Sequence, residues 1–360
     1  MKRFVCLLIL CIATISFAFG FSYKLELLSF DPLYEGYAAT KESPDTSFHF
    51  NYSANGIIDH VYVPNNGDGK YYFELDGKHS ALTASIKVGE TISLLRNTFS
   101  FGDKFPDISL DLSFQGSINF LTEYSIADIY GYDGTYFYGI TGALGDYVSF
   151  RFGYHHYSNH YGDYVFDRIE AADKPYFGDT KNYMYSRMNG NVIALSAKPL
   201  SWLRIYGEYN WMGDNPIIYR PDIFRPSYMQ KNPNIDYPSS YKARVINFGF
   251  EISYPIFKKL GNTTLAYDCH LYEEGKAIYF DPSTGSYLKP SEVYFDQNAP
   301  WDVEHSILLR QQLNSYCSFD VGFHSGRAPL NIFYHIQDAS YLTFGFSLKA
   351  KGGVKIVSTT

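Results

Sequence analysis

A histidine and a serine stand two residues apart near the middle of the chain, at His156 and Ser158. The preceding residues alternate between apolar and polar types, with Phe150, Phe152 and Tyr154 in the same parity as this pair, and such alternation predicts a β-strand. Residues i and i+2 of a strand share a face, with Cα atoms roughly 6.5–7 Å apart, so an imidazole can reach the hydroxyl. A serine hydroxyl becomes an effective nucleophile when such a base takes its proton. The pair therefore predicts nucleophilic chemistry on the apolar face of a strand.

A catalytic histidine usually needs a third group that fixes its tautomer. If a strand at 146–157 pairs with one at 184–197 so that Ser158 faces Asn182, the Asn182 amide arrives beside His156. We therefore name Asn182 as the orienting residue. Carboxylates of the intervening segment are rivals for this role: Asp163, Asp167 and Glu170.

Short alternating segments that could position these residues recur from Ala81 onwards. They are found at 82–88, 108–115, 203–211, 246–252, 265–271, 317–324 and 342–349. The chain is 19% aromatic, with 35 Tyr and 29 Phe, yet its mean hydropathy is only -0.21. No apolar run after the first twenty residues approaches the ~20 residues of a transmembrane helix. This composition is typical of outer-membrane β-strands with aromatic girdles.

The connections between the segments favour a barrel over a soluble sandwich. Short links near 144–146, 199–201, 255–261 and 313–314 alternate with long ones at about 158–182, 213–242, 273–304 and 325–339. Outer-membrane barrels have short periplasmic turns and long external loops. We therefore predict an all-β, antiparallel transmembrane barrel of about 12 strands, with room for 14, in a bacterial outer membrane.

This prediction divides the chain into four parts. Residues 1–20 have the charged start, apolar run and small-residue end of a secretory signal. Residues 21–80 are early strands, a plug or a periplasmic lead-in, and the sequence does not choose between these. The barrel spans 81–350, and 351–360 form a C-terminal tail. The segment TFGFSLKA before that tail resembles the C-terminal signal read by the barrel-assembly machinery, which is therefore an expected partner.

Charged residues recur at positions predicted to face the lumen. They are Lys87, Asp111, Arg151, Arg204, Glu208, Glu251, Asp268, Arg310 and Asp320. Mixed signs in a narrow lumen predict internal ion pairs and a filled interior rather than a wide pore. The mild net charge of -7 argues against a nucleic-acid partner.

The four residues HYSN at 156–159 resemble the H-x-S-N segment of two families of outer-membrane lipid hydrolases, the phospholipases A and the lipid A deacylases. In those families the histidine is the base, the serine is the nucleophile, and an asparagine or glutamate on the following strand is the third member. The resemblance implies these roles for His156, Ser158, and Asn182 or Glu170. It also implies calcium at the lipid headgroup if the chain is phospholipase-like. The phospholipase pattern continues with glycine where this chain has His160.

A longer stretch, HYSNHYGD at 156–163, resembles the H-x-S-S-H-x-G-D signature of a family of uncharacterised outer-membrane proteins, a domain of unknown function. The similarity continues through IADIYG at 126–131, the segment 182–187 and LRIYGE at 203–208. It implies a barrel and no established activity. The motif residues beside the His–Ser pair are Asn159, His160, Gly162, Asp163 and Arg187.

Two classes of function remain open from the sequence. The first is a lipid acyl-ester hydrolase acting on outer-leaflet lipids, with His156, Ser158 and Asn182 as its catalytic residues. The second is a non-catalytic barrel, either a small pore or a surface scaffold or adhesin, in which the histidines are interfacial residues and HxSxHxGD folds an external loop. A metal site at His156, His160 and Asp163 is disfavoured, because residues i and i+4 of a strand lie about 13 Å apart. We therefore predict no bound metal, apart from calcium in the phospholipase-like case. The oligomeric state is left open.

Overall fold

Twelve antiparallel strands close into a barrel in the computed structural model of the chain. The structure describes residues 21–54, 56, 60–61, 73–74, 81–102, 104–124, 128–162, 185–212, 244–272, 277–278, 280–281, 286–287, 294–295, 301–330, 339–350 and 354–356. The predicted signal at 1–20 and the long segment 163–184 lie outside these residues. The fold confirms the prediction of a barrel with about 12 strands.

The strands of the wall follow one another around the barrel in chain order. They are β2 (Thr46–Tyr52), β5 (Leu82–Phe101), β6 (Ile108–Glu123), β7 (Ile129–Leu144), β8 (Val148–Tyr161), β9 (Tyr185–Leu200), β10 (Leu203–Met212), β11 (Arg244–Tyr254), β12 (Thr263–Tyr272), β17 (Asp302–Gln312), β18 (Cys317–Gly326) and β19 (Ala339–Leu348). The last strand, β19, pairs with β2, and β2 pairs with β5, which closes the wall. The first barrel strand therefore lies at 46–52, within the N-terminal segment that precedes Ala81.

The remaining strands lie outside the closed wall. Strand β1 (Phe21–Ser29) pairs with the second half of the 20-residue β5, beyond the part that pairs with β2. Strand β20 (Val354–Ile356), in the C-terminal tail, pairs with β1. Three two-stranded pairs complete the set: β3 (His60–Val61) with β4 (Phe73–Glu74), β13 (Ala277–Ile278) with β16 (Tyr294–Phe295), and β14 (Phe280–Asp281) with β15 (Ser286–Tyr287).

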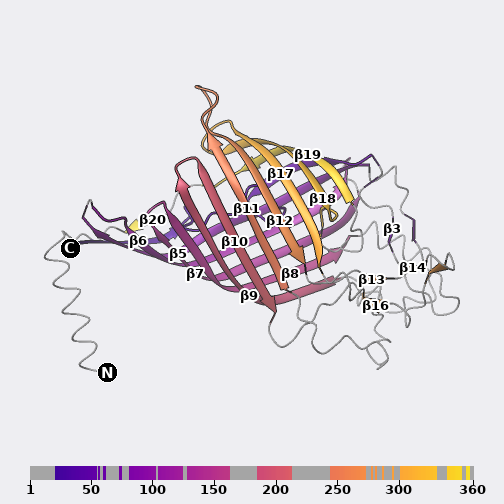
Figure 1. Cartoon of the computed structure of the whole chain (residues 1–360), viewed down its shortest axis with the longest axis horizontal. Helices are drawn as coiled ribbons and strands as arrows, with labels where there is room; N and C mark the ends of the chain where they lie inside the picture. The colour runs from indigo at the N-terminus through magenta and orange to yellow at the C-terminus, as the bar shows by residue number, and fades with distance from the viewer. Residues whose placement is uncertain are drawn as a thin grey trace.

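The two ends of the barrel differ in their connections. The short links β5–β6, β7–β8, β9–β10, β11–β12 and β17–β18 share one end with β1 and β20, whereas β3 and β13–β16 lie at the other (Figure 1). Short turns mark the periplasmic end of outer-membrane barrels. We therefore call the end that holds β1 and β20 the periplasmic end and the opposite end the outer end.

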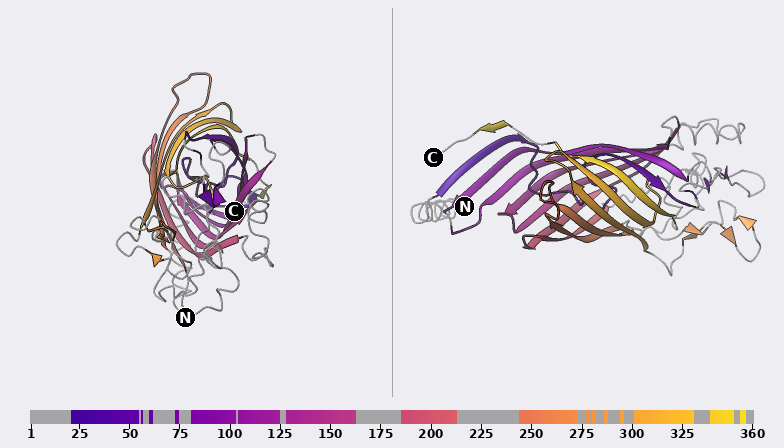
Figure 2. Two further views of the ribbon diagram at one scale, coloured as in Figure 1. Left: turned by 90° about the vertical axis from the view of Figure 1, so that its right-hand side faces the viewer. Right: turned by 90° about the horizontal axis from the view of Figure 1, so that it is seen from above.

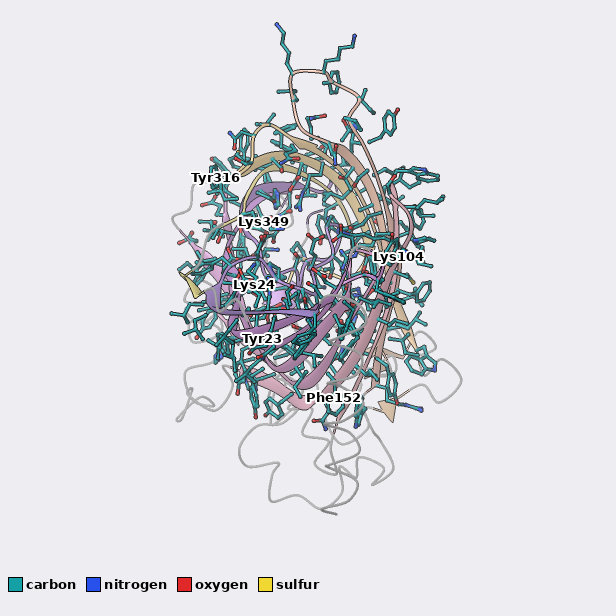
Figure 3. All side chains as sticks on the ribbon, turned by 90° about the vertical axis from the view of Figure 1, so that its left-hand side faces the viewer. Tyr23, Lys24, Lys104, Phe152, Tyr316 and Lys349 are labelled. Atoms are coloured by element: carbon teal, nitrogen blue, oxygen red, sulfur yellow. The ribbon has the colours of Figure 1, made fainter. Side chains whose placement is uncertain are left out.

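The wall has an apolar outer face and a polar inner face. Ile140, Phe152 and Leu195 are about half exposed, at 51%, 49% and 57%, and Figure 3 shows Phe152 on the outside of the ring. Leu, Ile and Phe side chains cover the outside of the other strands as well, while Ser, Thr, Asn and charged side chains are buried within. A belt of exposed apolar side chains around a closed sheet requires lipid as its solvent. The protein is an integral outer-membrane barrel. None of the described residues forms a helix long and apolar enough to cross a membrane.

The charged residues of the inner face form ion pairs, as the mixed signs predict. The Arg96 and Asp111 side chains are 2.9 Å apart, and Arg204 and Glu251 are 3.2 Å apart. Further pairs join Arg151 to Glu208, Arg310 to Asp320, Asp268 to His270, and Lys87 to Asp45. Each of these buried charges thus has a partner of opposite sign, which a charge removed from water requires.

Residues 30–45, which connect β1 to β2, lie inside the barrel, where the indigo part of the chain occupies the ring (Figure 2, left). The Tyr37 ring stacks on Tyr206 of β10 with ring centroids 3.9 Å apart. Ala39 packs against Ala266 of β12 and Leu308 of β17. We call residues 30–45 the lumen segment. Together with the side chains of the wall, it fills the interior seen in Figure 3.

Candidate active site on the outer wall

Strand β8 carries His156, Ser158 and His160 on its outer face, near the outer end of the barrel. The alternate residues Arg151, His155 and Tyr157 are buried in the lumen, whereas Phe152 is exposed. The parity read from the sequence therefore holds along this strand. The serine and both histidines follow the exposed Phe152 on the same face of β8, toward the outer end of the barrel.

The Ser158 hydroxyl makes its hydrogen bond with His160. The distance from Ser158 Oγ to His160 Nε2 is 2.7 Å, within the range of a good hydrogen bond. Because residues i-2 and i+2 of a strand both share the face of residue i, the sequence pattern alone could not choose between the two histidines. We expected His156 to be the base, whereas the observed partner of the hydroxyl is His160.

Two tyrosines of β7 hold the two histidine rings. The His160 ring stacks on Tyr132 at 4.5 Å between centroids, and the His156 ring stacks on Tyr136 at the same distance. Both contacts follow from the register, in which Tyr132 faces His160 and Tyr136 faces His156. Stacking of this kind restricts the histidine side chains and so fixes the directions of their nitrogens.

Between the two tyrosines, the residue directly opposite Ser158 is Gly134. A Cβ atom placed on Gly134 would meet only the Ser158 carbonyl oxygen, at 3.7 Å, an ordinary van der Waals contact, so a side chain could be accommodated at this position. The sequence Tyr132-x-Gly134-x-Tyr136 thus leaves a notch on the β7 side of the serine, which we call the Gly134 notch. A bulky acyl chain could reach Ser158 Oγ from this side.

The pairing of β8 with β9 corrects the predicted register. Ser158 faces Arg187, and His156 faces Asn189, so the expectation that Ser158 faces Asn182 is wrong. Asn182 and its rivals Asp163, Asp167 and Glu170 lie outside the described residues.

The apolar pattern of β9 explains the observed register. The expected pairing would have turned Ile193 and Leu195 into the lumen, whereas they are exposed on the outer wall, with Val192 and Ala194 buried inside. A slip by an odd number of residues reverses every side chain of a strand, so the large apolar residues select the register.

Asn189 is the residue that sequence reasoning missed. It stands directly opposite His156 in the backbone register of β8 and β9. The signal that would have found it is the parity of Ile193 and Leu195, which assigns odd-numbered positions of β9 to the outer face.

Other motif residues have structural roles. A Cβ atom on Gly162 would collide with the Ile129 carbonyl oxygen, so only glycine fits where β8 ends against β7. The Gly162 amide donates a hydrogen bond to the Tyr130 carbonyl at 2.8 Å. Behind the wall, His155 Nδ1 lies 2.9 Å from Asn210 Oδ1, within the lumen network. Gly162 and His155 therefore belong to the frame of the site rather than to its chemistry.

A metal site needs several side chains with donor atoms close together. Within the part of the chain that the structure describes, no group of three or more His, Cys, Asp or Glu side chains could hold a metal ion. The chemistry below therefore uses only the side chains of this chain.

Comparison with known proteins found similar barrels among solved structures. Outer-membrane phospholipase A from Escherichia coli aligns with 85% of this chain and 93% of its own, at 10% identity and a TM-score of 0.44. The outer-membrane phospholipase of Salmonella typhi, described as a dimer with bound calcium, aligns with 88% of this chain and 94% of its own, at 11% identity and a TM-score of 0.42. The NanC porin aligns with 85% of this chain and all of its own, at 12% identity and a TM-score of 0.38.

No protein-family model matches the chain, and no curated protein matches it. The resemblance to the H-x-S-S-H-x-G-D family therefore gains no support. At these identities and scores the solved structures carry no activity over to this chain.

Proposed function

We propose that the protein is a serine acyl-ester hydrolase that acts on outer-membrane lipids at the outer end of its barrel. The observation that carries the proposal is the 2.7 Å hydrogen bond between Ser158 Oγ and His160 Nε2 on the lipid-facing wall. A nucleophile paired with a base, in reach of acyl chains, is the minimal equipment for ester cleavage.

In the proposed reaction, His160 takes the hydroxyl proton while Ser158 Oγ attacks the ester carbonyl carbon. The tetrahedral intermediate collapses, the bond to the alcohol oxygen breaks, and the alcohol leaves with the proton from His160. Water then attacks the acyl-serine, again with His160 as base, and releases a fatty acid. Positioned acid–base groups of this kind contribute about 10²–10⁴-fold to a rate.

The oxyanion of the intermediate needs a nearby donor or positive charge. Arg187 occupies the backbone position opposite Ser158 in the β8–β9 register. We assign to Arg187 the role of stabilising the oxyanion, and to the Gly134 notch that of admitting the acyl chain.

A second arrangement of the same site uses His156 as the base. In it, Asn189 is the orienting residue in place of Asn182, because Asn189 stands opposite His156. We favour His160, since its ring nitrogen makes the hydrogen bond with the hydroxyl.

A non-catalytic barrel is the alternative function, and one observation favours it. The same wall carries a second histidine opposite a serine, His305 and Ser325, where His305 Nδ1 lies 2.9 Å from the Tyr267 hydroxyl and Ser325 Oγ lies 3.2 Å from Ser340 Oγ. Histidine, tyrosine and serine thus recur at this barrel surface as ordinary interfacial residues. The direct contact between hydroxyl and imidazole distinguishes the Ser158 site.

This second pair supplies the matched controls for the decisive experiment. Fatty-acid release from phospholipid and from lipid A is measured for the refolded barrel in detergent, with and without calcium. Ser158→Ala and His160→Ala should each lower the rate about 10²-fold or more, whereas Ser325→Ala and His305→Ala should leave it unchanged.

The outcomes separate the proposals. If fatty-acid release is lost in His156→Ala and Asn189→Ala but retained in His160→Ala, the protein is still a hydrolase, and its base is His156. No release by the wild type on either lipid, or equal loss in the control variants, would reject the hydrolase in favour of the non-catalytic barrel.

A further inference from the structure

The lumen segment enters and leaves the barrel by the same mouth. Before it, Ser29 of β1 pairs with Ser93 of β5, and after it, Thr46 of β2 pairs with Leu348 at the periplasmic end of β19. Between these anchors the chain reaches Lys41, whose ammonium group lies 3.1 Å from the Ala328 carbonyl oxygen just beyond the outer end of β18. A loop with both ends at one mouth can leave the lumen without threading through the barrel.

Polar contacts hold most of the lumen segment in place. Lys41 pairs with Glu304 at 3.0 Å, and Asp45 pairs with both Lys87 and Arg310. Further hydrogen bonds join the segment to the wall, among them those from Tyr37 to Glu208, from Tyr157 to Glu42, and from the Ala38 amide to Glu251. Withdrawal would expose all these groups to water, which replaces each lost hydrogen bond, but the net costs of the separate contacts add up and keep the lumen segment in place most of the time.

The barrel is too wide for its own side chains to fill, so the lumen segment is needed to occupy the interior. Side chains alone fill the interior of a barrel of about eight strands, and the diameter grows roughly in proportion to strand number. A twelve-stranded wall therefore needs additional chain inside it, which the lumen segment supplies. Without that segment, charged groups of both signs would line the passage, among them Lys87, Arg204, Glu208, Glu304 and Arg310.

The packing around the lumen segment already contains hollow space. A cavity of about 350 Å³ lies at the periplasmic mouth, lined by Glu35, Asp45, Glu251 and Arg310 among others. A smaller one of about 50 Å³ lies between the segment and the wall, beside Lys41, His49 and Asp320. Both cavities are large enough to admit water, so the lumen segment does not fill the barrel completely.

The charge of the lumen segment gives its movement a direction. Residues 30–45 contain Asp31, Glu35, Glu42 and Asp45 against a single Lys41, a formal net charge of 1 - 4 = -3. A negatively charged element that moves within the membrane responds to the transmembrane potential. Movement toward the periplasm is favoured when that side is positive.

We propose that residues 30–45 form a withdrawable plug, and that the barrel is an ion channel which is closed in this conformation and opens when the plug leaves by the periplasmic mouth. Opening is more frequent when the periplasmic side is positive. The passage carries small ions, because it is polar and lined by both signs of charge.

Single-channel recording in a planar bilayer with oriented insertion tests this proposal on the full chain. The wild type should show openings that are more frequent with the periplasmic side positive. Lys41→Ala removes the contacts with Glu304 and Ala328 and should raise the open probability about tenfold. Lys24→Ala is the matched control, since Lys24 pairs with Glu26 of its own strand β1. It should behave as the wild type.

A reversible cross-link fixes the plug in place. Ala39 and Ala266 pack together, so Ala39→Cys with Ala266→Cys, in a chain whose Cys269 and Cys317 are replaced by serine, should form a disulfide. Oxidation should abolish the openings, and reduction should restore them. Openings that survive oxidation would overturn the proposal, as would a folded wild type that never conducts at either polarity. Folding is verified by heat-modifiable migration on gels, and the wild-type and cross-linked proteins decide the matter even if Lys41→Ala fails to fold.

Discussion

At the scale of single residues, the outer wall combines a nucleophile with two histidines that differ in their partners. His160 contacts the Ser158 hydroxyl, and His156 stands opposite Asn189. The tyrosines of β7 order both rings, while Gly134 leaves the hydroxyl accessible from one side. The contact between the Ser158 hydroxyl and His160 distinguishes this site from other serines and histidines of the wall, and the Gly134 notch beside it offers a second test of the hydrolase.

Filling the Gly134 notch should therefore reduce hydrolysis without disturbing the Ser158–His160 pair. Gly134→Leu adds a side chain where the nearest atom to its Cβ is 3.7 Å away, so the barrel should fold normally. Fatty-acid release should fall at least tenfold, mainly through loss of access for the acyl chain. Gly207→Leu is the matched control, because Gly207 on β10 has similar open space, with its nearest atom at 3.9 Å. Equal activity in Gly134→Leu and the wild type would show that substrate does not pass this position.

At the scale of strands, the sequence determined the faces better than the registers. Alternation in Phe150, Phe152 and Tyr154 was enough to place His156 and Ser158 on the outer wall, because side-chain parity is a local property. The partner of Ser158 on β9 depends on pairing across a long connection, which no turn fixes. Ile193 and Leu195 indicate which face of β9 is lipid-exposed and hence the register. Their exposure, however, becomes evident only once the wall has been assembled.

The lumen segment was harder still to assign from sequence. Residues 30–45 have no alternation, and their polar partners lie 40 to nearly 300 residues further along the chain, such as Lys87, Glu208 and Ala328. Only closure of the barrel brings these groups together. The individual charged residues of the inner face could be predicted from alternation. The lumen segment, which forms ion pairs with some of them, could not.

The end of β8 gives a prediction at this scale. Gly162→Ala should destabilise the barrel by about 1–3 kcal/mol, since its Cβ would collide with the Ile129 carbonyl oxygen of β7 and force the two backbones apart. Gly134→Ala, on the adjacent strand, should be close to neutral because its Cβ meets no close atom. Denaturant unfolding of the two variants in the same detergent measures the difference. Equal stability would mean that β8 ends with more freedom than the Gly162 contact implies.

At the scale of the whole molecule, the orientation of the barrel decides which lipids reach Ser158. With the short turns in the periplasm, the Ser158 site faces the outer leaflet, whereas the reverse orientation would turn it toward the inner leaflet. Cysteine labelling in intact cells distinguishes the two, in a chain whose Cys269 and Cys317 are replaced by serine. Tyr124→Cys, an exposed position just after β6 at the outer end, should react with a membrane-impermeant maleimide. Ser315→Cys, in the short β17–β18 link, should react only after the outer membrane is permeabilised, because that link is predicted to be periplasmic. Labelling of Ser315→Cys but not Tyr124→Cys in intact cells would reverse the orientation, and with it the leaflet that supplies the substrate and the mouth by which the plug leaves.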